Sequence, residues 1–380
     1  MAQAILQFGT GRFLQAYVDL FVSQALEAGQ AIGGITVLQT TGNPQSSARL
    51  LALARAEPYP VLLRGLRHGY RIDETVHVDS VREALHADRD WADVLEAVAT
   101  QVQVIVSNTA DAGYALSDAD TADLFRQPAQ TPRSFPAKLL VLLHHRWRQQ
   151  PDAPLTLYPC ELVSRNGDTL RDLVVALGRE WGATPEFTNY LGGHCVWVNS
   201  MVDRIVSSAL DPVGAVAEPY ALWAIEQQTG MVLPCTHPAI VLTDSLATFE
   251  RRKLWLLNLA HTFLAECWIA QGSLPGQTVL QAMDAPSMRT PLEAVWLEEV
   301  LPVFDAEGEA DAARTYLDEV RERLLNPFLE HRLSDIAQNH AQKKQRRMAP
   351  VVACVEERSL TIKQVRLRAA LAGKYDDQPP

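Results

Sequence analysis

The sequence lacks a surplus of positive charge. Among its 380 residues, 45 Asp and Glu outnumber 34 Lys and Arg, so the formal net charge is −11 with histidine neutral. A protein that binds nucleic acid normally carries a basic surplus or a basic stripe. The single dense basic run is Lys343-Lys-Gln-Arg-Arg347. We therefore expect no nucleic-acid partner.

Three other features are missing. The five cysteines are widely spaced and contain no CxxC pair, so we expect reduced thiols with neither a disulfide nor a zinc site. No apolar run approaches the roughly eighteen residues of a membrane span, and the start Met1–Ile5 lacks the basic residues of a signal peptide. His144 and His145 are adjacent and point about 100° apart on a helix, so we expect surface histidines rather than a metal pair. These absences favour a cytoplasmic protein with no membrane contact and no metal ion.

The length of the chain and its pattern of apolar residues predict two domains. Up to Ile205, short apolar runs typical of strands alternate with helical segments, as in a mostly parallel sheet. Beyond Ile205 the pattern is helical, apart from a possible strand at Ala239–Thr243. We predict the α/β class, with a Rossmann-like dinucleotide-binding domain over residues 1–212 and a mainly helical substrate domain over residues 213–380.

The amino-terminal segment has the pattern of a dinucleotide-binding turn. A short apolar run, residues 4–8, leads into Gly9-Thr-Gly11-Arg12-Phe13, and helical spacing follows. Backbone N–H groups at such a turn suit a pyrophosphate. Leu14 replaces the usual third glycine, and an ordinary strand-to-helix turn would have a similar sequence. We predict that Gly9, Gly11, Arg12 and Phe13 bind the cofactor.

The next predicted strand, Ile35–Gln39, bears on which cofactor is bound. An NAD site usually has an acid at the end of this strand, where it holds the ribose hydroxyls. Here Gln39, Thr40 and Thr41 stand instead. The nearest cation is Arg49, which we expect to be a solvated helix residue. The sequence predicts NAD, with Gln39 at the cofactor, and leaves NADP open.

Later strands add candidates at their carboxyl ends, where ligands bind in an open α/β sheet. Ser107 and Asn108 follow the strand 102–106 and form either an ordinary turn or a contact with the nicotinamide. Glu161 follows the strand 155–159, where a carboxylate more often anchors a loop than takes part in catalysis. A small strand insertion is expected between residues 59 and 81.

The helix expected over Glu250–Ala265 carries three polar side chains among apolar ones. With Lys253 at zero, Asn258 falls at about 140° and His261 at about 80°, so all three share one sector. A helix that is apolar nearly all round is buried, and burial would lower the pKa of a lysine toward the range of a general base. Asn258 and His261 could then hold a substrate oxygen. The alternative is a lysine that snorkels to solvent beside two satisfied core polar residues.

The chain resembles the polyol-specific long-chain dehydrogenases, the family of mannitol dehydrogenases and hexuronate reductases. The resemblance covers about residues 4–350. It is carried by motifs in a shared order: Ile5-Leu-Gln-Phe-Gly-Thr-Gly-Arg-Phe-Leu14, Val106-Ser-Asn-Thr-Ala-Asp-Ala-Gly113, Pro159-Cys-Glu-Leu162, Asn166-Gly-Asp168, Met201-Val-Asp-Arg-Ile205, Arg252-Lys-Leu-Trp-Leu-Leu-Asn-Leu-Ala-His-Thr262 and Asn326-Pro-Phe-Leu-Glu-His331.

The resemblance implies metal-independent hydride transfer with NAD, or NADP, on a sugar acid or polyol, by a monomer or homodimer. The family pattern K-x4-N-x2-H maps onto Lys253 as general acid/base and onto Asn258 and His261 at the substrate oxygen. Asn199 matches an asparagine that lies at the substrate in mannitol-type members. Lys343 and Arg347 are candidates for a substrate carboxylate or form a solvated helix end.

The sequence departs from the family pattern at two positions. Gln15 stands where arginine is common, and Leu259 stands beside Asn258 where a small glycine is usual. The resemblance leaves several activities open: hexuronate reduction, mannitol 2-dehydrogenase-like oxidation, a reaction on a sugar phosphate, or a catalytically silent nucleotide-binding protein.

Overall fold

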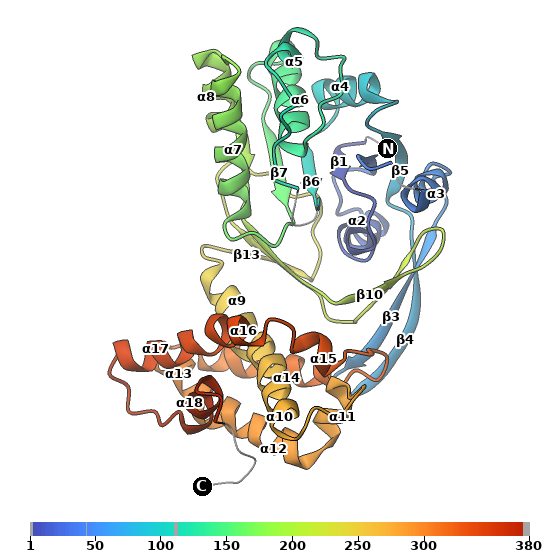
Figure 1. Cartoon of the computed structure of the whole chain (residues 1–380). Helices are drawn as coiled ribbons and strands as arrows, with labels where there is room; N and C mark the ends of the chain where they lie inside the picture. Colours follow the sequence, from blue (N-terminus) through green and yellow to red (C-terminus); the bar gives the residue numbers. More distant parts are fainter. Residues whose placement is uncertain (1–2, 43, 110–112, 375–380) are drawn as a thin grey trace. The chain divides into compact units, whose positions relative to one another are not determined.

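The computed structural model describes residues 3–42, 44–109 and 113–374 (Figure 1). Its largest sheet has six parallel strands in the order β5-β2-β1-β6-β7-β8. The strand order reverses on either side of β1, as in a doubly wound fold, so the predicted Rossmann-like domain is confirmed. The strands are β1 (Ile5–Phe8), β2 (Ile35–Gln39), β5 (Val81–His86), β6 (Val104–Ser107), β7 (Leu155–Pro159) and β8 (Cys195–Trp197).

Helices cover this sheet because right-handed crossovers carry the chain to one face before the order reverses and to the other face afterwards. Figure 1 shows α2 and α3 on the opposite side of the strands from α7 and α8. The helices are α1 (Arg12–Gln15), α2 (Val18–Glu27), α3 (Pro44–Leu53), α4 (Trp91–Thr100), α5 (Asp123–Arg126), α6 (Phe135–Gln149), α7 (Asn166–Glu180) and α8 (Pro185–Gly193). α4, α6, α7 and α8 share one apolar core with the strands.

The chain also forms two smaller sheets, most of whose strands were not predicted from the sequence. The predicted insertion between residues 59 and 81 is the hairpin β3 (Tyr59–Arg67) and β4 (Tyr70–Val78), extended by β11 (Ala215–Ala217) and β10 (Val206–Ala209). A three-stranded sheet joins β9 (Ser200–Asp203), β12 (Leu222–Glu226) and β13 (Ile240–Thr243). Of the strands beyond Ile205, only β13 was expected.

The chain divides into two compact units. Unit 1 comprises residues 1–63, 74–217 and 221–246, and unit 2 comprises residues 64–73, 218–220 and 247–380. The division falls later than the predicted 212/213 boundary, because β12 and β13 belong with the strands of unit 1. The tip of the β3–β4 hairpin belongs to unit 2.

Unit 2 is helical around one apolar core. Its helices are α9 (Ala247–Arg252), α10 (Leu259–Ala270), α11 (Val279–Asp284), α12 (Pro286–Ala294), α13 (Leu301–Ala306), α14 (Ala310–Leu324), α15 (Leu333–Ile336), α16 (His340–Arg347), α17 (Ala349–Glu357) and α18 (Val365–Leu371). Two π-helical segments interrupt this series, η1 (Lys253–Asn258) and η2 (Val295–Val300). Within the described residues, no helix is both long enough and apolar enough to cross a bilayer.

His144 is not the surface residue expected from the sequence. Its ring stacks on Phe125 at 4.4 Å between centroids and meets Phe187 edge-on at 5.0 Å. Burial, aided by Arg148, lowers the pKa of His144 to about 4. The ring therefore acts as a neutral packing group. Among the described residues no cluster of side chains has the composition of a metal site.

Asp19 gives unit 1 a pH-dependent stability. This α2 residue is 1% exposed, and Tyr59 donates a 2.7 Å hydrogen bond to its Oδ2. Its Oδ1 is buried without a hydrogen-bond partner in the described chain. Burial raises the pKa of Asp19 to about 7, from an ordinary value of 3.8.

We expect Asp19→Asn to remove this dependence. Between pH 4 and pH 7 the native carboxyl holds a proton that the unfolded chain releases, so the free energy of unfolding falls as pH rises. Relative to wild type, the variant should gain up to ~4 kcal/mol between pH 4 and pH 8. Urea unfolding at several pH values measures this, with Glu27→Gln at the exposed end of α2 as control. Parallel pH profiles for wild type and Asp19→Asn would contradict the assignment.

Candidate active site

Unit 1 contains a pocket of about 320 Å³ at the carboxyl ends of β1, β2 and β6. This is the point where the strand order reverses and where open α/β sheets bind ligands. Eleven of the described residues line it: Gly9, Thr10, Gly11, Gln39, Thr40, Thr41, Gln45, Ser46, Arg49, Asn108 and Thr109. Gly9 has φ of 114°, and a Cβ there would lie 2.9 Å from the Asn108 backbone oxygen, so the turn requires glycine at this position.

Gln39 ends β2 inside this pocket and is 1% exposed. Its Nε2 donates to the Thr41 backbone oxygen at 2.8 Å, and its Oε1 is buried with no partner among the described residues. An acceptor left unpaired in a pocket wall fits a ligand that brings a hydroxyl donor, such as a ribose. The pocket chemistry therefore fits a dinucleotide.

The predicted cofactor residues divide into two groups. Gly9, Gly11, Gln39 and Asn108 line the pocket, whereas Arg12, Phe13 and Ser107 do not. Arg12 is exposed, and Phe13 stacks on Tyr17 with 4.8 Å between ring centroids. The sequence missed the contribution of α3. Arg49, expected to be solvated, is half-buried in the pocket wall.

Glu161 anchors the loop after β6, which is the commoner role that the sequence suggested. It accepts hydrogen bonds from the Ser107 hydroxyl at 3.1 Å and from the Thr109 backbone and hydroxyl, each at 3.0 Å. Tyr114 also donates to it at 3.3 Å. Through its contact with Glu161, Ser107 helps to hold the loop that presents Asn108 and Thr109, and its contact with the cofactor stays a prediction. Residues 110–112 of this sequence motif lie outside the described chain.

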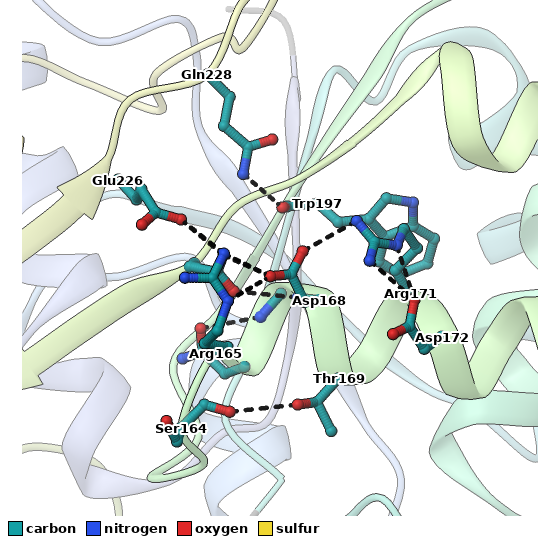
Figure 2. Close-up of polar contacts among 12 residues, drawn as sticks. Ser164, Arg165, Asp168, Thr169, Arg171, Asp172, Trp197, Glu226 and Gln228 are labelled. Atoms are coloured by element: carbon teal, nitrogen blue, oxygen red, sulfur yellow. Dashed lines mark hydrogen bonds and ion pairs between the residues drawn. The ribbon is translucent and has the colours of Figure 1, made fainter. Parts of the chain in front are cut away.

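Asn199 is fully buried, and its amide makes three hydrogen bonds within unit 1. Its Nδ2 donates to Asp168 at 3.1 Å and to Glu226 at 2.8 Å, while its Oδ1 accepts from the Asp168 backbone at 3.1 Å. Figure 2 shows Arg165 bonded to the same two carboxylates. These bonds use both Nδ2 hydrogens and leave only one lone pair of Oδ1 for a further donor. The substrate contact of Asn199 stays a prediction.

The Asn166-Gly-Asp168 motif requires a glycine at its centre. A Cβ at this position would lie 2.6 Å from the Val198 carbonyl group. The neighbouring Asn166 donates to the carbonyls of Pro159 and Ser200, each at 2.9 Å. The motif thus joins the start of α7 to two strands.

In unit 2, the catalytic candidates lie in and just after a π-helical turn. The Leu259 N–H donates to the Leu254 oxygen, five residues back, across η1. On a regular α-helix Lys253 and Asn258 would be about 140° apart. The additional residue of the π turn removes roughly one step of 100° and leaves about 40°, and it brings His261 within about 20° of Lys253. The π turn therefore gathers the three side chains more closely than the sequence predicted.

Side chains from other helices hold this turn through its carbonyl oxygens. The Trp296 indole, in η2, donates to the Leu256 oxygen at 3.1 Å. Thr262 donates to the Asn258 oxygen at 3.1 Å, and Arg347 reaches the same oxygen at 3.3 Å. η2 has its own cause, because Pro302 cannot donate a helical hydrogen bond. Such turns are frequent at functional sites.

The side chains of Asn258 and His261 remain available for a ligand. Within the described chain, neither the Asn258 amide nor the His261 ring has a hydrogen-bond partner. Burial, together with the charges of His331, Arg347 and other cations, holds the pKa of His261 well below its ordinary value. The imidazole is therefore neutral near pH 7. Lys253 is half-buried, which lies between the two alternatives left open by the sequence, a buried lysine and one that snorkels to solvent.

Two cations of α16 lie beside this group with no acidic partner among the described residues. Arg347 donates to Thr262 Oγ1 at 3.0 Å, and Lys343 donates to the Ile336 backbone oxygen at 2.7 Å. Burial lowers the pKa of both, with a further contribution from a neighbouring arginine in each case. Their charge favours an anionic ligand.

The rest of the basic run has other roles. Lys344 pairs with Glu266 at 3.1 Å, and His340 contacts the same carboxylate at 2.6 Å, which fixes α16 against α10. Arg346 is exposed. The expected solvated helix end therefore applies to only part of the run.

Two further sequence motifs prove to be positioning elements. Asn326 donates to the Arg64 oxygen at 3.1 Å and so fixes the hairpin tip within unit 2, while His331 packs on His261 at 4.9 Å between ring centroids. In unit 1, the unusual Gln15 is 1% exposed and bridges the Thr10 oxygen, at 2.8 Å, to the Gly214 N–H, at 2.9 Å. Nothing in local sequence spacing indicates either long-range contact.

Comparison with known proteins decides the family. Residues 3–233 match the Mannitol dehydrogenase Rossmann domain, and residues 245–379 match the Mannitol dehydrogenase C-terminal domain. The chain belongs to the mannitol dehydrogenase family. This confirms the resemblance recognised in the sequence motifs and makes the protein an oxidoreductase of that family.

Relatives within the mannitol dehydrogenase family cover most of the chain. Altronate oxidoreductase of Halalkalibacterium halodurans is 30% identical over 92% of this chain and 70% of its own length. The altronate oxidoreductase of Bacillus subtilis is 28% identical over 92% of this chain and 74% of its own length. D-sorbitol dehydrogenase in substrate-free form shares the fold with a TM-score of 0.83 at 19% identity, over 98% of this chain and 80% of that one. Pseudomonas fluorescens mannitol 2-dehydrogenase, solved with NAD and D-mannitol, has a TM-score of 0.71 at 16% identity. The match covers 98% of this chain and 78% of that one.

Proposed function

We propose that this protein interconverts a keto sugar acid and its hydroxy acid with a nicotinamide dinucleotide, as in the reduction of tagaturonate to altronate. The observation that carries the proposal is the arrangement of unit 2. Within residues 3–42, 44–109 and 113–374, Lys343 and Arg347 have no acidic partner, and they lie beside a neutral imidazole and an unbonded amide on the helix of Lys253. A sugar acid supplies both the carboxylate for the cations and the carbonyl for the polar groups. The 30% identity to an altronate oxidoreductase supports this substrate class.

In this reaction the cofactor, Lys253, Asn258 and His261 have different roles. When bound, the dinucleotide supplies or accepts the hydride. In the reducing direction, Lys253 gives a proton to the substrate carbonyl oxygen as that oxygen becomes a hydroxyl. The Asn258 amide and the N–H of neutral His261 donate hydrogen bonds to the same oxygen and stabilise its developing charge. In the oxidising direction, Lys253 takes the proton from the hydroxyl.

Lys343→Met tests the carboxylate contact. Removing this charge is expected to raise KM for D-tagaturonate by about tenfold or more, because a hydrogen bond to a charged group is lost. kcat should change much less, because Lys343 does not contact the reacting oxygen. Steady-state kinetics with NADH measures both constants.

The control is Arg346→Met, which removes an exposed charge from the same helix. We expect KM to stay near the wild-type value in that variant. Equal KM values for the Lys343→Met and Arg346→Met variants would remove the carboxylate assignment. Faster wild-type turnover of D-fructose than of any hexuronate would favour a neutral polyol substrate.

A further inference from the structure

Among the described residues, the pocket wall beyond β2 contains no carboxylate. Gln39, Thr40 and Thr41 occupy the place where an NAD-specific site usually holds an acid. Such an acid accepts hydrogen bonds from the ribose hydroxyls and repels a phosphate on the 2′ oxygen. The Gln39 amide can accept from a ribose hydroxyl through its unpaired Oε1, but it carries no charge. Gln39 can therefore hydrogen-bond the ribose without repelling a phosphate on the 2′ oxygen.

The same wall presents one cation. Arg49 is the single charged side chain among the described pocket residues, and it has no ion-pair partner in the described chain. It lies on α3 three and four residues after Ser46 and Gln45, so these three pocket residues share one helix face. A guanidinium matches the geometry of a phosphate and binds it through paired N–H groups.

We propose that this pocket takes the 2′-phosphate of NADP(H), with Arg49 as the specificity-determining residue, and that the protein binds NADP(H) more tightly than NAD(H). The inference rests on the proposed function in one respect, namely that the Rossmann pocket holds a nicotinamide dinucleotide. It differs from the cofactor predicted from sequence, which was NAD with NADP left open and Arg49 in solvent. The difference is that α3 turns Arg49 toward the end of β2.

The test is equilibrium binding by calorimetry on the full chain, without substrate. The ligands are NADP⁺ and NAD⁺, with 2′,5′-ADP and 5′-AMP as fragments that isolate the 2′-phosphate. In wild type, NADP⁺ should bind about tenfold or more tightly than NAD⁺, and 2′,5′-ADP more tightly than 5′-AMP, as expected for one charge-assisted contact. Because Arg49 is partly exposed, the advantage should shrink at high salt.

Three variants isolate the residue responsible. Arg49→Ala should weaken NADP⁺ binding by about tenfold or more and leave NAD⁺ binding within about threefold. Arg55→Ala, an exposed arginine just beyond the same helix, should change neither. Gln39→Glu keeps the shape of the side chain but adds a charge, and it should reverse the preference toward NAD⁺. Arg49→Gln replaces Arg49→Ala if the smaller side chain impairs folding.

The possible results separate two conclusions. Tight NAD⁺ binding with no gain from the 2′-phosphate, or equal loss of both dinucleotides in Arg49→Ala, would overturn the NADP(H) assignment and leave the proposed function in place. No binding of any dinucleotide would overturn both. A 2′-phosphate gain that persists in Arg49→Ala would assign the phosphate contact to another residue and contradict the role of Arg49.

Discussion

Lys253→Met should lower kcat for the sugar acid by about 10³-fold, while binding of the dinucleotide stays near the wild-type value. The size follows from the loss of a positioned general acid/base, which contributes about 10²–10⁴-fold. Lys253 lies at the start of η1 in unit 2, whereas the residues of the cofactor pocket all belong to unit 1. Stopped-flow absorbance of NAD(P)H and calorimetry of cofactor binding measure the two effects separately.

Two controls accompany this variant. Arg252→Met removes a neighbouring charge whose guanidinium lies over Phe249, and we expect kcat to stay within about tenfold of wild type for a residue that contacts no substrate. Added methylamine should restore part of the activity of Lys253→Met, because a small amine can replace the lost proton donor. Near-normal turnover in Lys253→Met would refute the catalytic assignment.

Glu218→Gln should cost unit 2 about 3–5 kcal/mol of stability, because it leaves a buried arginine without its counter-ion. Arg323 and Glu218 form an ion pair at 2.9 Å with side chains 3% and 2% exposed. Arg323 also lies over the Tyr220 ring at 4.4 Å from its centroid. The charge of Arg323 is among those that lower the pKa of His261, so the variant should also strengthen that effect. Urea unfolding measures the loss of stability.

The double variant Glu218→Leu/Arg323→Met distinguishes charge from packing. Replacing both partners by apolar side chains removes the uncompensated charge, so most of the lost stability should return. A loss below about 1 kcal/mol in Glu218→Gln would place the pair in the class of solvent-screened ion pairs and contradict its burial.

The Rossmann half of the fold follows well from sequence because its strands are buried on both faces. The predicted strands Ile35–Gln39 and Leu155–Pro159 have those bounds in the structure. Parallel strands that are covered on both sides appear as continuous apolar runs, which are easy to recognise. β10 is different, since Val206–Ala209 is half-exposed and contains two serines. Its place depends on pairing with β11, which local sequence does not encode.

The helical half was predicted less accurately, for two physical reasons. Although the pattern beyond Ile205 is helical, residues 325–332 form a loop before α15 and α16, because Asn326 and His331 make tertiary contacts that replace helical ones. The π turns depend on donors from other helices, such as the Trp296 indole. Further along the chain, α17 and α18 agree with the helical pattern expected beyond Ile205.

The candidate site, too, could be predicted from the sequence only in part. Motif spacing placed Lys253, Asn258 and His261 on one helix, and the π turn brings them onto a narrower face. The hydrogen bonds of the Asn199 amide and the placement of Arg49 in the pocket wall depend on residues distant in sequence. Their roles could be assigned only once hydrogen-bond partners and burial were known.

The most direct test of the central claim is the absorbance of NADPH and NADH when wild-type protein is mixed in turn with D-tagaturonate, D-fructuronate and D-fructose. We predict rapid oxidation of the reduced cofactor with a hexuronate, fastest with D-tagaturonate, and little or none with the neutral ketose. No oxidation with either hexuronate, under conditions where the dinucleotide binds, would contradict the proposed reaction.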